Sequence, residues 1–381
     1  MELSLLQHYW WALVSLLGAL LVFLLFVQGG QSLIFFTAKT EQQKSLLINL
    51  LGHKWELTYT TLVTFGGAIF ASFPLYYSTS FGGAYWLWIT ILLLFVIQAV
   101  SYEFRSKAGN LLGKKTYDVF LFLNGFLGAV MLGVAVGTFY TGGAFTVNKM
   151  ALARTVEPVI SQWSNGWHGL DALAHPFNLL MGVGVYLAAA TLALLFFFQS
   201  VDDAEVKARA RKQVTVIGTV FVLGFVVLLI YLFCLTGYSV NPATDIITAE
   251  PFKYLHNMLE LVWPIAILLI GVVLVLWGLG SVIFCKGKYS FWITSVGVVL
   301  AVFPLLLCAA YNNTAYFVSS INIQNSLTLK NSSSSLFTLK VMAYVSLLIP
   351  FVLAYIAYIW YKLTHKPISK EDLESPDATV Y

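Results

Sequence analysis

Charged residues are scarce in this 381-residue chain: only 10% are Asp, Glu, Lys or Arg, whereas 59% are hydrophobic. An ordinary soluble domain has roughly 25% charged residues. A soluble fold of this size would have to bury an apolar excess that its interior cannot absorb. The composition therefore excludes a single soluble globular fold and indicates a protein whose solvent is lipid.

Cysteine is also scarce, and Cys234, Cys285 and Cys308 are the only three. The odd count and the lack of a C-x-x-C pair imply neither a disulfide framework nor a cysteine metal cluster. We expect all three to be buried as small apolar side chains. Glycine-rich phosphate loops, nucleophile elbows and zinc motifs are missing, so soluble-enzyme chemistry has no basis here. We expect no nucleic-acid partner.

Histidine is missing from the middle of every apolar run. The six histidines fall in loops or at the ends of the runs, and no two lie four residues apart on one expected helix: His8, His53, His168, His175, His256 and His365. Haem or metal in a membrane bundle generally takes imidazoles that project from the helices into the core. We therefore expect no metal or haem bound by this chain alone.

Long apolar runs are what the chain has in abundance. A helix needs about 20 mostly apolar residues to cross a membrane. Nine runs qualify, at about 9–29, 55–79, 83–101, 118–140, 175–198, 213–236, 259–284, 291–312 and 338–361. They predict an all-α polytopic membrane protein, because a barrel would show alternating stretches of about ten residues. We expect one bundle domain over 1–365, built as two four-helix bundles plus a peripheral helix, and a short cytoplasmic tail over 366–381.

The distribution of Lys and Arg predicts the orientation. With nine spans, 16 of the 21 basic residues fall on one side: Lys39, Lys44, Lys54, Arg105, Lys107, Lys114, Lys115, Lys207, Arg209, Arg211, Lys212, Lys286, Lys288, Lys362, Lys366 and Lys370. The other side has Lys149, Arg154, Lys253, Lys330 and Lys340. Because basic residues are enriched on the cytoplasmic side, we expect a cytoplasmic C-terminus and an external N-terminus. The first run lacks a basic leading segment and a small-x-small cleavage site, so we expect it to be retained as a membrane helix.

Ionisable side chains near membrane depth are the best guide to function, because burying them is costly. Three carboxylates enter apolar runs from the expected cytoplasmic side: Glu56, Glu103 and Asp118. They are candidates for a proton path. Glu56 leads, because it shares a helix face with Thr60. The alternative roles are structural: Glu103 would pair with Lys107 one turn on, and Asp118 would stabilise a helix N-terminus.

A series of short motifs runs along nearly the whole chain. They are Trp10-Trp11, Trp55-Glu56, Gly66-Gly67-Ala68 with Phe70, Ala71 and Pro74, Phe104-Arg105-Ser106-Lys107, Gly133-Val134-Ala135 with Gly137, Pro176-Phe177, Ser326-Leu327-Thr328, Thr338-Leu339 with Val341-Met342, and Ile368-Ser369-Lys370-Glu371-Asp372-Leu373. In this order and at these separations, the set resembles subunit II of the cytochrome bd family of quinol oxidases.

The resemblance implies a heterodimer in the bacterial cytoplasmic (inner) membrane. Subunit I would carry two b haems, one haem d and the quinol site, and subunit II would complete the complex without a redox centre of its own. Membrane lipid and a small accessory subunit are further implied partners. The complex would oxidise quinol, reduce oxygen to water and take protons from the cytoplasm. Glu56 matches the acid of the family's Trp-Asp motif in a cytoplasmic proton path.

The chain departs from the family pattern at the positions of several charged residues. The family's first span commonly ends in Asp-Gly-x-Asp, where this chain has Gln28 and Gln31 in place of the acids. Gln98 replaces a common Arg, and Lys54 replaces the usual His before Trp. Glutamine orders water but does not titrate, which puts a proton route through this subunit in doubt.

Two other functions stay open at this point. A secondary transporter would show half-helices broken by Gly or Pro at matching positions of two repeats. The only sign of that is the similarity between residues 71–75, Ala-Ser-Phe-Pro-Leu, and residues 301–305, Ala-Val-Phe-Pro-Leu. A lone scaffold protein would explain the composition but not the ordered motifs.

Overall fold

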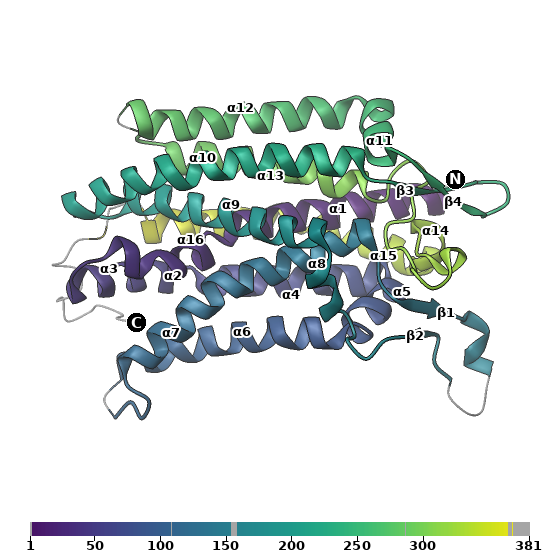
Figure 1. The fold of residues 1–381 in the computed structure, drawn as a ribbon, viewed down its shortest axis with the longest axis horizontal. Helices are drawn as coiled ribbons and strands as arrows, with labels where there is room; N and C mark the ends of the chain where they lie inside the picture. The colour runs from purple at the N-terminus through teal and green to yellow at the C-terminus, as the bar shows by residue number, and fades with distance from the viewer. Residues whose placement is uncertain (1, 108, 154–157, 286, 365–367, 369–381) are drawn as a thin grey trace.

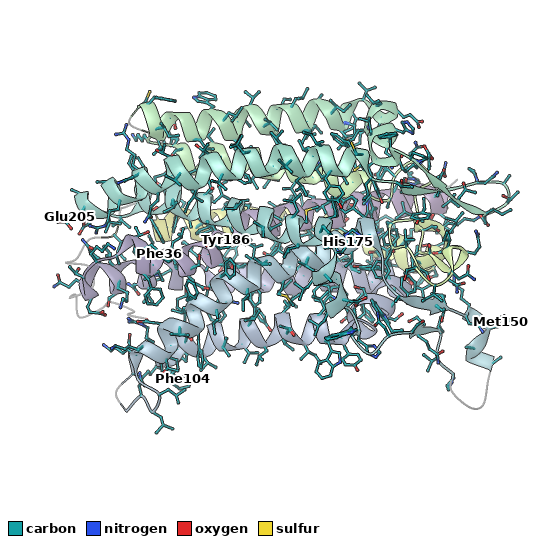
Figure 2. The ribbon with its side chains drawn as sticks, viewed as in Figure 1. Phe36, Phe104, Met150, His175, Tyr186 and Glu205 are labelled. Carbon is teal, nitrogen blue, oxygen red and sulfur yellow. The ribbon has the colours of Figure 1, made fainter. Side chains whose placement is uncertain are left out.

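The computed structural model describes residues 2–107, 109–153, 158–285, 287–364 and 368. Its long helices lie side by side along the long axis of the molecule (Figure 1). Two β-hairpins, α11 and α14 lie at one end, here called the hairpin end, and α3 lies at the other, here called the α3 end. Phe36, Phe104 and Glu205 lie toward the α3 end, and Met150 lies toward the hairpin end (Figure 2).

Helices make up most of the described chain. They are α1 (Glu2–Leu24), α2 (Phe26–Thr37), α3 (Glu41–Gly52), α4 (Trp55–Ser72), α5 (Pro74–Tyr77), α6 (Tyr85–Phe104), α7 (Lys114–Leu123), α8 (Ala129–Thr141), α9 (Pro176–Ser200), α10 (Ala204–Cys234), α11 (Lys253–Leu261), α12 (Trp263–Phe284), α13 (Ser290–Cys308), α14 (Leu329–Ser332), α15 (Leu336–Ser346) and α16 (Ile349–Thr364). Two π-helical turns, η1 (Ser78–Gly82) and η2 (Asn124–Gly128), and three short 3₁₀ turns, η3 (Lys149–Ala153), η4 (Leu170–Ala174) and η5 (Ile323–Asn325), complete them.

The strands form two small antiparallel hairpins. Strand β1 (Phe145–Val147) pairs with β2 (Ser161–Trp163), and β3 (Gly237–Val240) pairs with β4 (Ile247–Glu250). Both hairpins belong to connections at the hairpin end (Figure 1). The core therefore consists of packed helices, and the expected all-α architecture is confirmed.

Seven helical stretches within the described residues are long and apolar enough to cross a membrane: Glu2–Thr37, Tyr85–Phe104, Lys114–Thr141, Pro176–Ser200, Ala204–Cys234, Trp263–Phe284 and Ser290–Cys308. Helices α15 and α16 form a pair bent by 40° that would make an eighth. The chain is thus a multi-pass helical protein of membrane type.

The second expected span, 55–79, differs from the others. It corresponds to α4, which has 18 residues and ends at Ser72, because Pro74 begins the short helix α5. Proline cannot donate the helical hydrogen bond and crowds the preceding turn. Glu56 and four threonines also dilute the apolar content of α4, so its length and composition do not by themselves mark it as a span.

The burial pattern is that of a lipid-exposed bundle. Leu194, Leu195 and Phe197 of α9 are fully buried, whereas Leu223 and Ile230 of α10 are largely exposed. Exposed apolar helix faces of this length fit a hydrocarbon environment and not water.

The expectation of three buried cysteines is wrong for two of them. Cys308 is buried, but Cys234 and Cys285 are exposed. Cys234 is the last residue of α10, and Cys285 directly follows α12, so both lie at helix ends, where less of the bundle covers them.

Several sequence predictions fall outside the described residues. Arg154, Lys286, Lys366 and Lys370 of the basic set, His365, and the expected tail over 366–381 apart from Ile368 belong to this group.

Candidate functional site

The structure gathers four buried amide side chains from three separate elements. Gln28 and Gln31 of α2, Gln98 of α6 and Asn124 of η2 are all 0% exposed. Gln28 Nε2 donates to Gln98 Oε1 at 3.1 Å and to Asn124 Oδ1 at 3.4 Å. Gln31 Nε2 donates to the hydroxyl of Tyr102 at 3.0 Å. We call these five residues the polar column.

Glycine lets the helices approach closely enough to form the column. A Cβ atom added at Gly29 would overlap the backbone of Ala189 in α9, and one added at Gly125 would lie 2.6 Å from the backbone oxygen of Gln28. The π-helical turn η2 carries Asn124 itself. Such turns insert a residue into a helix and are frequent at functional sites. The Gln-Gly-Gly-Gln sequence thus places two amides at a tight helix junction.

Each amide of the column keeps one buried atom without a hydrogen-bond partner. These atoms are Gln28 Oε1, Gln31 Oε1, Gln98 Nε2 and Asn124 Nδ2. An unsatisfied buried polar atom costs about 1–3 kcal/mol. These four atoms leave the column with unused hydrogen-bonding capacity inside the bundle.

A buried ion pair lies beyond the column toward the α3 end. Arg105 directly follows α6, three residues after Tyr102, and its Nε lies 2.6 Å from Asp118 Oδ1. The Arg105 and Asp118 side chains are only 2% and 5% exposed. Lys44 Nζ lies 3.6 Å from Asp118 Oδ2. Asp118 therefore does not act as a helix N-terminal residue, as the alternative interpretation expected; it holds two cations.

The other two expected carboxylates lie at the surface of the chain. Glu103 accepts from Lys107 Nζ at 2.6 Å, the pair that its spacing predicts. Glu56 is exposed on α4 and, within the described residues, has no hydrogen bond or ion pair. No recorded contact joins Glu56, Glu103 and Asp118 to one another in the described part of the chain, so the structure does not gather them into one site.

Lys54 is a buried cation that the sequence did not single out as functional. It directly precedes α4 and is 1% exposed, and its Nζ lies 4.9 Å from the ring centroid of Trp360. Burial lowers the pKa of Lys54 to about 8. The neighbouring Trp55 stacks on Tyr102 with ring centroids 5.9 Å apart, which places Lys54 beside the α3 end of the polar column.

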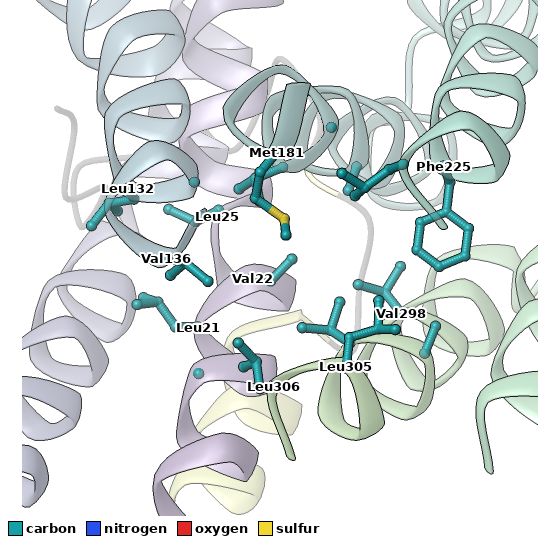
Figure 3. A pocket seen from close by; sticks show the side chains of 18 of the residues that line it. Leu21, Val22, Leu25, Leu132, Val136, Met181, Phe225, Val298, Leu305 and Leu306 are labelled. Atoms are coloured by element: carbon teal, nitrogen blue, oxygen red, sulfur yellow. The ribbon is translucent and has the colours of Figure 1, made fainter. Parts of the chain in front are cut away.

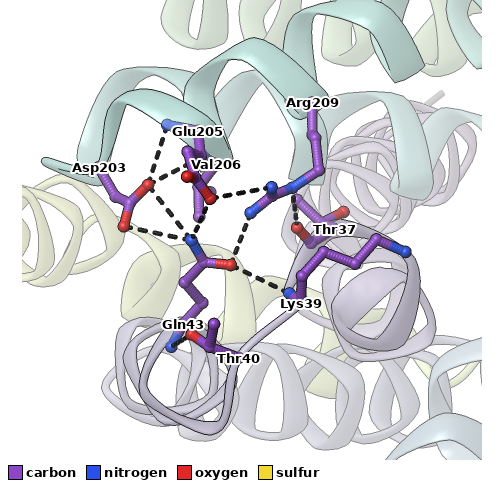
Figure 4. A network of polar contacts seen from close by, with 8 residues as sticks. All are labelled: Thr37, Lys39, Thr40, Gln43, Asp203, Glu205, Val206 and Arg209. Atoms are coloured by element: carbon purple, nitrogen blue, oxygen red, sulfur yellow. Dashed lines mark hydrogen bonds and ion pairs between the residues drawn. The ribbon is translucent and has the colours of Figure 1, made fainter.

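A second polar network joins helices at the α3 end (Figure 4). Gln43 of α3 donates to Glu205 at 3.2 Å and accepts from Arg209 Nη2 at 2.6 Å. Arg209 Nε also donates to the carbonyl of Thr37 at 2.7 Å. Asp203 caps α10 by accepting from the backbone N–H of Glu205. Every group here has a partner that ties α2 and α3 to α10, which indicates a structural clamp.

An apolar cavity of about 110 Å³ lies inside the bundle (Figure 3). Val22, Met181 and Leu305 are among the residues that line it. Cavities of this kind stay dry and accept only apolar guests. Polar chemistry therefore belongs to the column and to the α4 surface, not to this cavity.

Five of the six histidines and all three cysteines lie within the described residues. No group of three His, Cys, Asp or Glu side chains there could hold a metal ion. His53 contacts the carbonyl of Asn49, and His168 contacts the carbonyl of Gly83. The His53 ring therefore engages the backbone of α3, and the His168 ring engages the segment just before α6.

The sequence named Gln28, Gln31 and Gln98 but not their partners. Asn124 could have been found by asking which polar side chains interrupt an apolar run, since it lies within 118–140, whereas Tyr102 falls just after the run 83–101 and gives no such signal. The contacts among these side chains could not be predicted, because Gln28 is separated by 70 residues from Gln98 and by 96 from Asn124.

The fold and burial define a multi-pass helical membrane protein whose interior carries a neutral polar column. Comparison with known proteins then gives its family. The model of the family described as cytochrome bd terminal oxidase subunit II matches residues 6–363. The chain belongs to this family.

Individual relatives agree over the full length. The chain is 26% identical to cytochrome bd-I ubiquinol oxidase subunit 2 of Escherichia coli (strain K12), over 100% of both chains. It is 28% identical to cytochrome bd ubiquinol oxidase subunit 2 of Bacillus subtilis (strain 168), over 96% of this chain and 98% of the relative. These relatives are subunits of an oxidoreductase complex.

A solved structure shares the fold. A chain of the bd oxidase from Geobacillus thermodenitrificans superposes with a TM-score of 0.62 over 93% of this chain and 99% of its own length, at 16% identity. At this identity the likeness concerns the arrangement of the helices alone.

Proposed function

We propose that this chain is the second subunit of a bd-type terminal quinol oxidase, which couples quinol oxidation to the reduction of oxygen to water. The observation that carries the proposal is the family match over residues 6–363. Oxidation of two quinols releases four electrons and four protons, and reduction of one O₂ to two waters consumes four of each. The match also favours this function over a secondary transporter.

Subunit I would hold two b haems, haem d and the quinol site, and this chain would be haem-free. What supports this division is the chemistry of the side chains: the described histidines lie in connections or near helix ends, so none is placed to face a partner imidazole across the core. The chain would then support the haem-bearing subunit in the bacterial cytoplasmic membrane, together with lipid and a small accessory subunit.

The proposed topology has nine spans, an external N-terminus and a cytoplasmic C-terminus. The basic connections support it, because those before α3, between α6 and α7 and between α9 and α10 lie at the α3 end (Figure 1). Helix α4 would be the second of these nine spans. Its polar residues Glu56, Thr60 and Thr64 are all exposed, and an exposed carboxylate on a membrane helix is stable only where protein or water covers it.

Glu56 would therefore face subunit I and contribute to cytoplasmic proton uptake. A carboxyl group covered by protein can gain and lose a proton, which a path needs. Asp118 is a weaker candidate, because Arg105 and Lys44 hold its charge, and Glu103 is paired with Lys107.

The test is oxygen consumption by the complex purified with its haem-bearing partner. Glu56→Gln should lower turnover at least fivefold while haem content stays normal. Glu103→Gln, which removes an exposed acid at the same end, should leave turnover unchanged. Unchanged turnover in Glu56→Gln would assign this residue a structural role, and a stable chain that never copurifies with haem would contradict the proposed function.

A further inference from the structure

The polar column has the unpaired donors and acceptors that an internal water molecule would satisfy. Its four unpartnered atoms comprise two acceptors, Gln28 Oε1 and Gln31 Oε1, and two donors, Gln98 Nε2 and Asn124 Nδ2. Exchanging the O and N positions of these amides does not provide the missing partners, since each amide would still leave one atom without a hydrogen bond. Water both donates and accepts, and buried water typically makes about three hydrogen bonds to such atoms.

The charges around the column favour water over a cation. None of the five column residues carries a charge at neutral pH. Toward the α3 end, Arg105 and Lys54 are buried cations, and Asp118 is the buried carboxylate that pairs with Arg105. Lys44 and Glu41 form a further pair at 2.7 Å beside Asp118. Together these five side chains carry one net positive charge. Further charged side chains around them are exposed: Glu56, Glu103, Lys107, Lys114 and Lys115.

A surplus of positive charge also opposes the passage of protons. Hydronium is a cation, and pores that conduct water exclude it with an Arg side chain or with positive helix ends. Arg105 fits this role, because its Nη2 is buried without a hydrogen-bond partner and it caps the end of α6, three residues after Tyr102. The column also lacks any carboxylate that could take up a proton along its length.

We infer that the polar column binds ordered water and does not carry the protons consumed in turnover. Protons that reach the partner through this subunit then travel by the exposed face of α4, where Glu56 lies, and not through the bundle interior. The part of this inference that concerns protons rests on the proposed function, because it is tested by turnover. The presence of ordered water in the column can be tested without it.

The experiment uses the complex purified with its haem-bearing partner. Gln28→Leu removes the amide that joins α2 to Gln98 and Asn124 and blocks the column with an apolar side chain. Gln98→Met is a second, more flexible replacement in case the first fails to assemble. Gln162→Leu, an exposed change in β2 at the hairpin end, is the matched control. Oxygen consumption, haem content and melting temperature are measured for each, and maps showing ordered water are obtained for wild type and Gln28→Leu.

The expected result is density for water within hydrogen-bond distance of the four atoms in wild type and its loss in Gln28→Leu, with turnover of both column variants within twofold of the control. A tenfold loss of turnover in these variants, at normal haem content and melting temperature, would overturn the inference that the column does not carry protons. Direct repacking of the amides with no water between them would overturn the water site. A wild-type complex that consumes no oxygen would instead contradict the proposed function, and the map alone would decide the water site.

Discussion

Asp118 and Glu103 look alike in the sequence but differ in how deeply their carboxylates are buried. Asp118 is 5% exposed and neutralises Arg105. Replacing it by Asn keeps the shape but leaves a buried guanidinium without its counter-charge, and breaking a buried pair in this way costs about 3–5 kcal/mol. We expect Asp118→Asn to lower the melting temperature of the purified complex clearly.

The control for that change is Glu103→Gln. The Glu103 and Lys107 side chains are 58% and 59% exposed, and exposed ion pairs contribute about 0–1 kcal/mol. The melting temperature of this variant should stay close to that of wild type. Equal shifts in the two variants would show that the Asp118 pair is not buried in the assembled complex.

The same two residues show how far sequence reasoning reaches. The Glu103 pair was predictable, because residues four apart share a helix face. The Asp118 pair spans 13 residues and depends on the turn around Gly113, whose φ of +79° reverses the chain between α6 and α7. The amide contacts of the polar column depend on packing between distant helices, which no local pattern encodes.

At the scale of the helices, the close packing of α2 against α9 leaves no room for an added methyl group at Gly29. A Cβ added at Gly29 would overlap the Ala189 backbone, whereas the nearest atom to one added at Gly184 is Leu228 Cδ2 at 3.7 Å. Overpacking costs about 1–3 kcal/mol, and Gly to Ala in an open helical position gains about 0.5–1 kcal/mol. We expect Gly29→Ala to lower the melting temperature and Gly184→Ala to maintain or raise it.

The opposite order of these two glycine variants would show that α2 and α9 separate in the complex. Gly184→Ala is also the control for a general intolerance of crowding at α9, because both glycine contacts involve that helix.

Helix positions were largely predictable, but their limits were not. Every expected apolar run coincides with helical structure, because the hydrophobic signal marks the part of a helix that lipid or core surrounds. The first helical stretch continues to Thr37, past the expected end at 29, because Gln28 to Ser32 are polar or small yet buried. Helix α3 was missed since its mixed sequence, with Glu41, Gln42, Gln43 and Lys44, lacks an apolar run.

At the scale of the whole molecule, the exposed faces of α10 and α4 differ in polarity, and this difference indicates which face meets lipid and which meets a protein partner. Helix α10 exposes Val216, Val220 and Leu223, an apolar face suited to hydrocarbon. Helix α4 exposes Glu56, Thr60, Val63 and Thr64 on one side, spaced by 4, 3 and 1 residues. Because polar side chains at helix contacts in membranes hydrogen-bond across helices, the α4 side is the one that we expect the haem-bearing subunit to cover.

A bulky residue on each face tests this assignment. Val63 and Val220 are 57% and 48% exposed, so either can be replaced by Trp without overpacking the isolated chain. If a partner packs against α4, Val63→Trp forces that interface apart and should lower the haem copurifying with a tagged chain at least fivefold. Val220→Trp would project into lipid, which accommodates indole, and haem recovery should equal that of wild type. Normal recovery with Val63→Trp would place the partner on another face, and loss with Val220→Trp would point to α10.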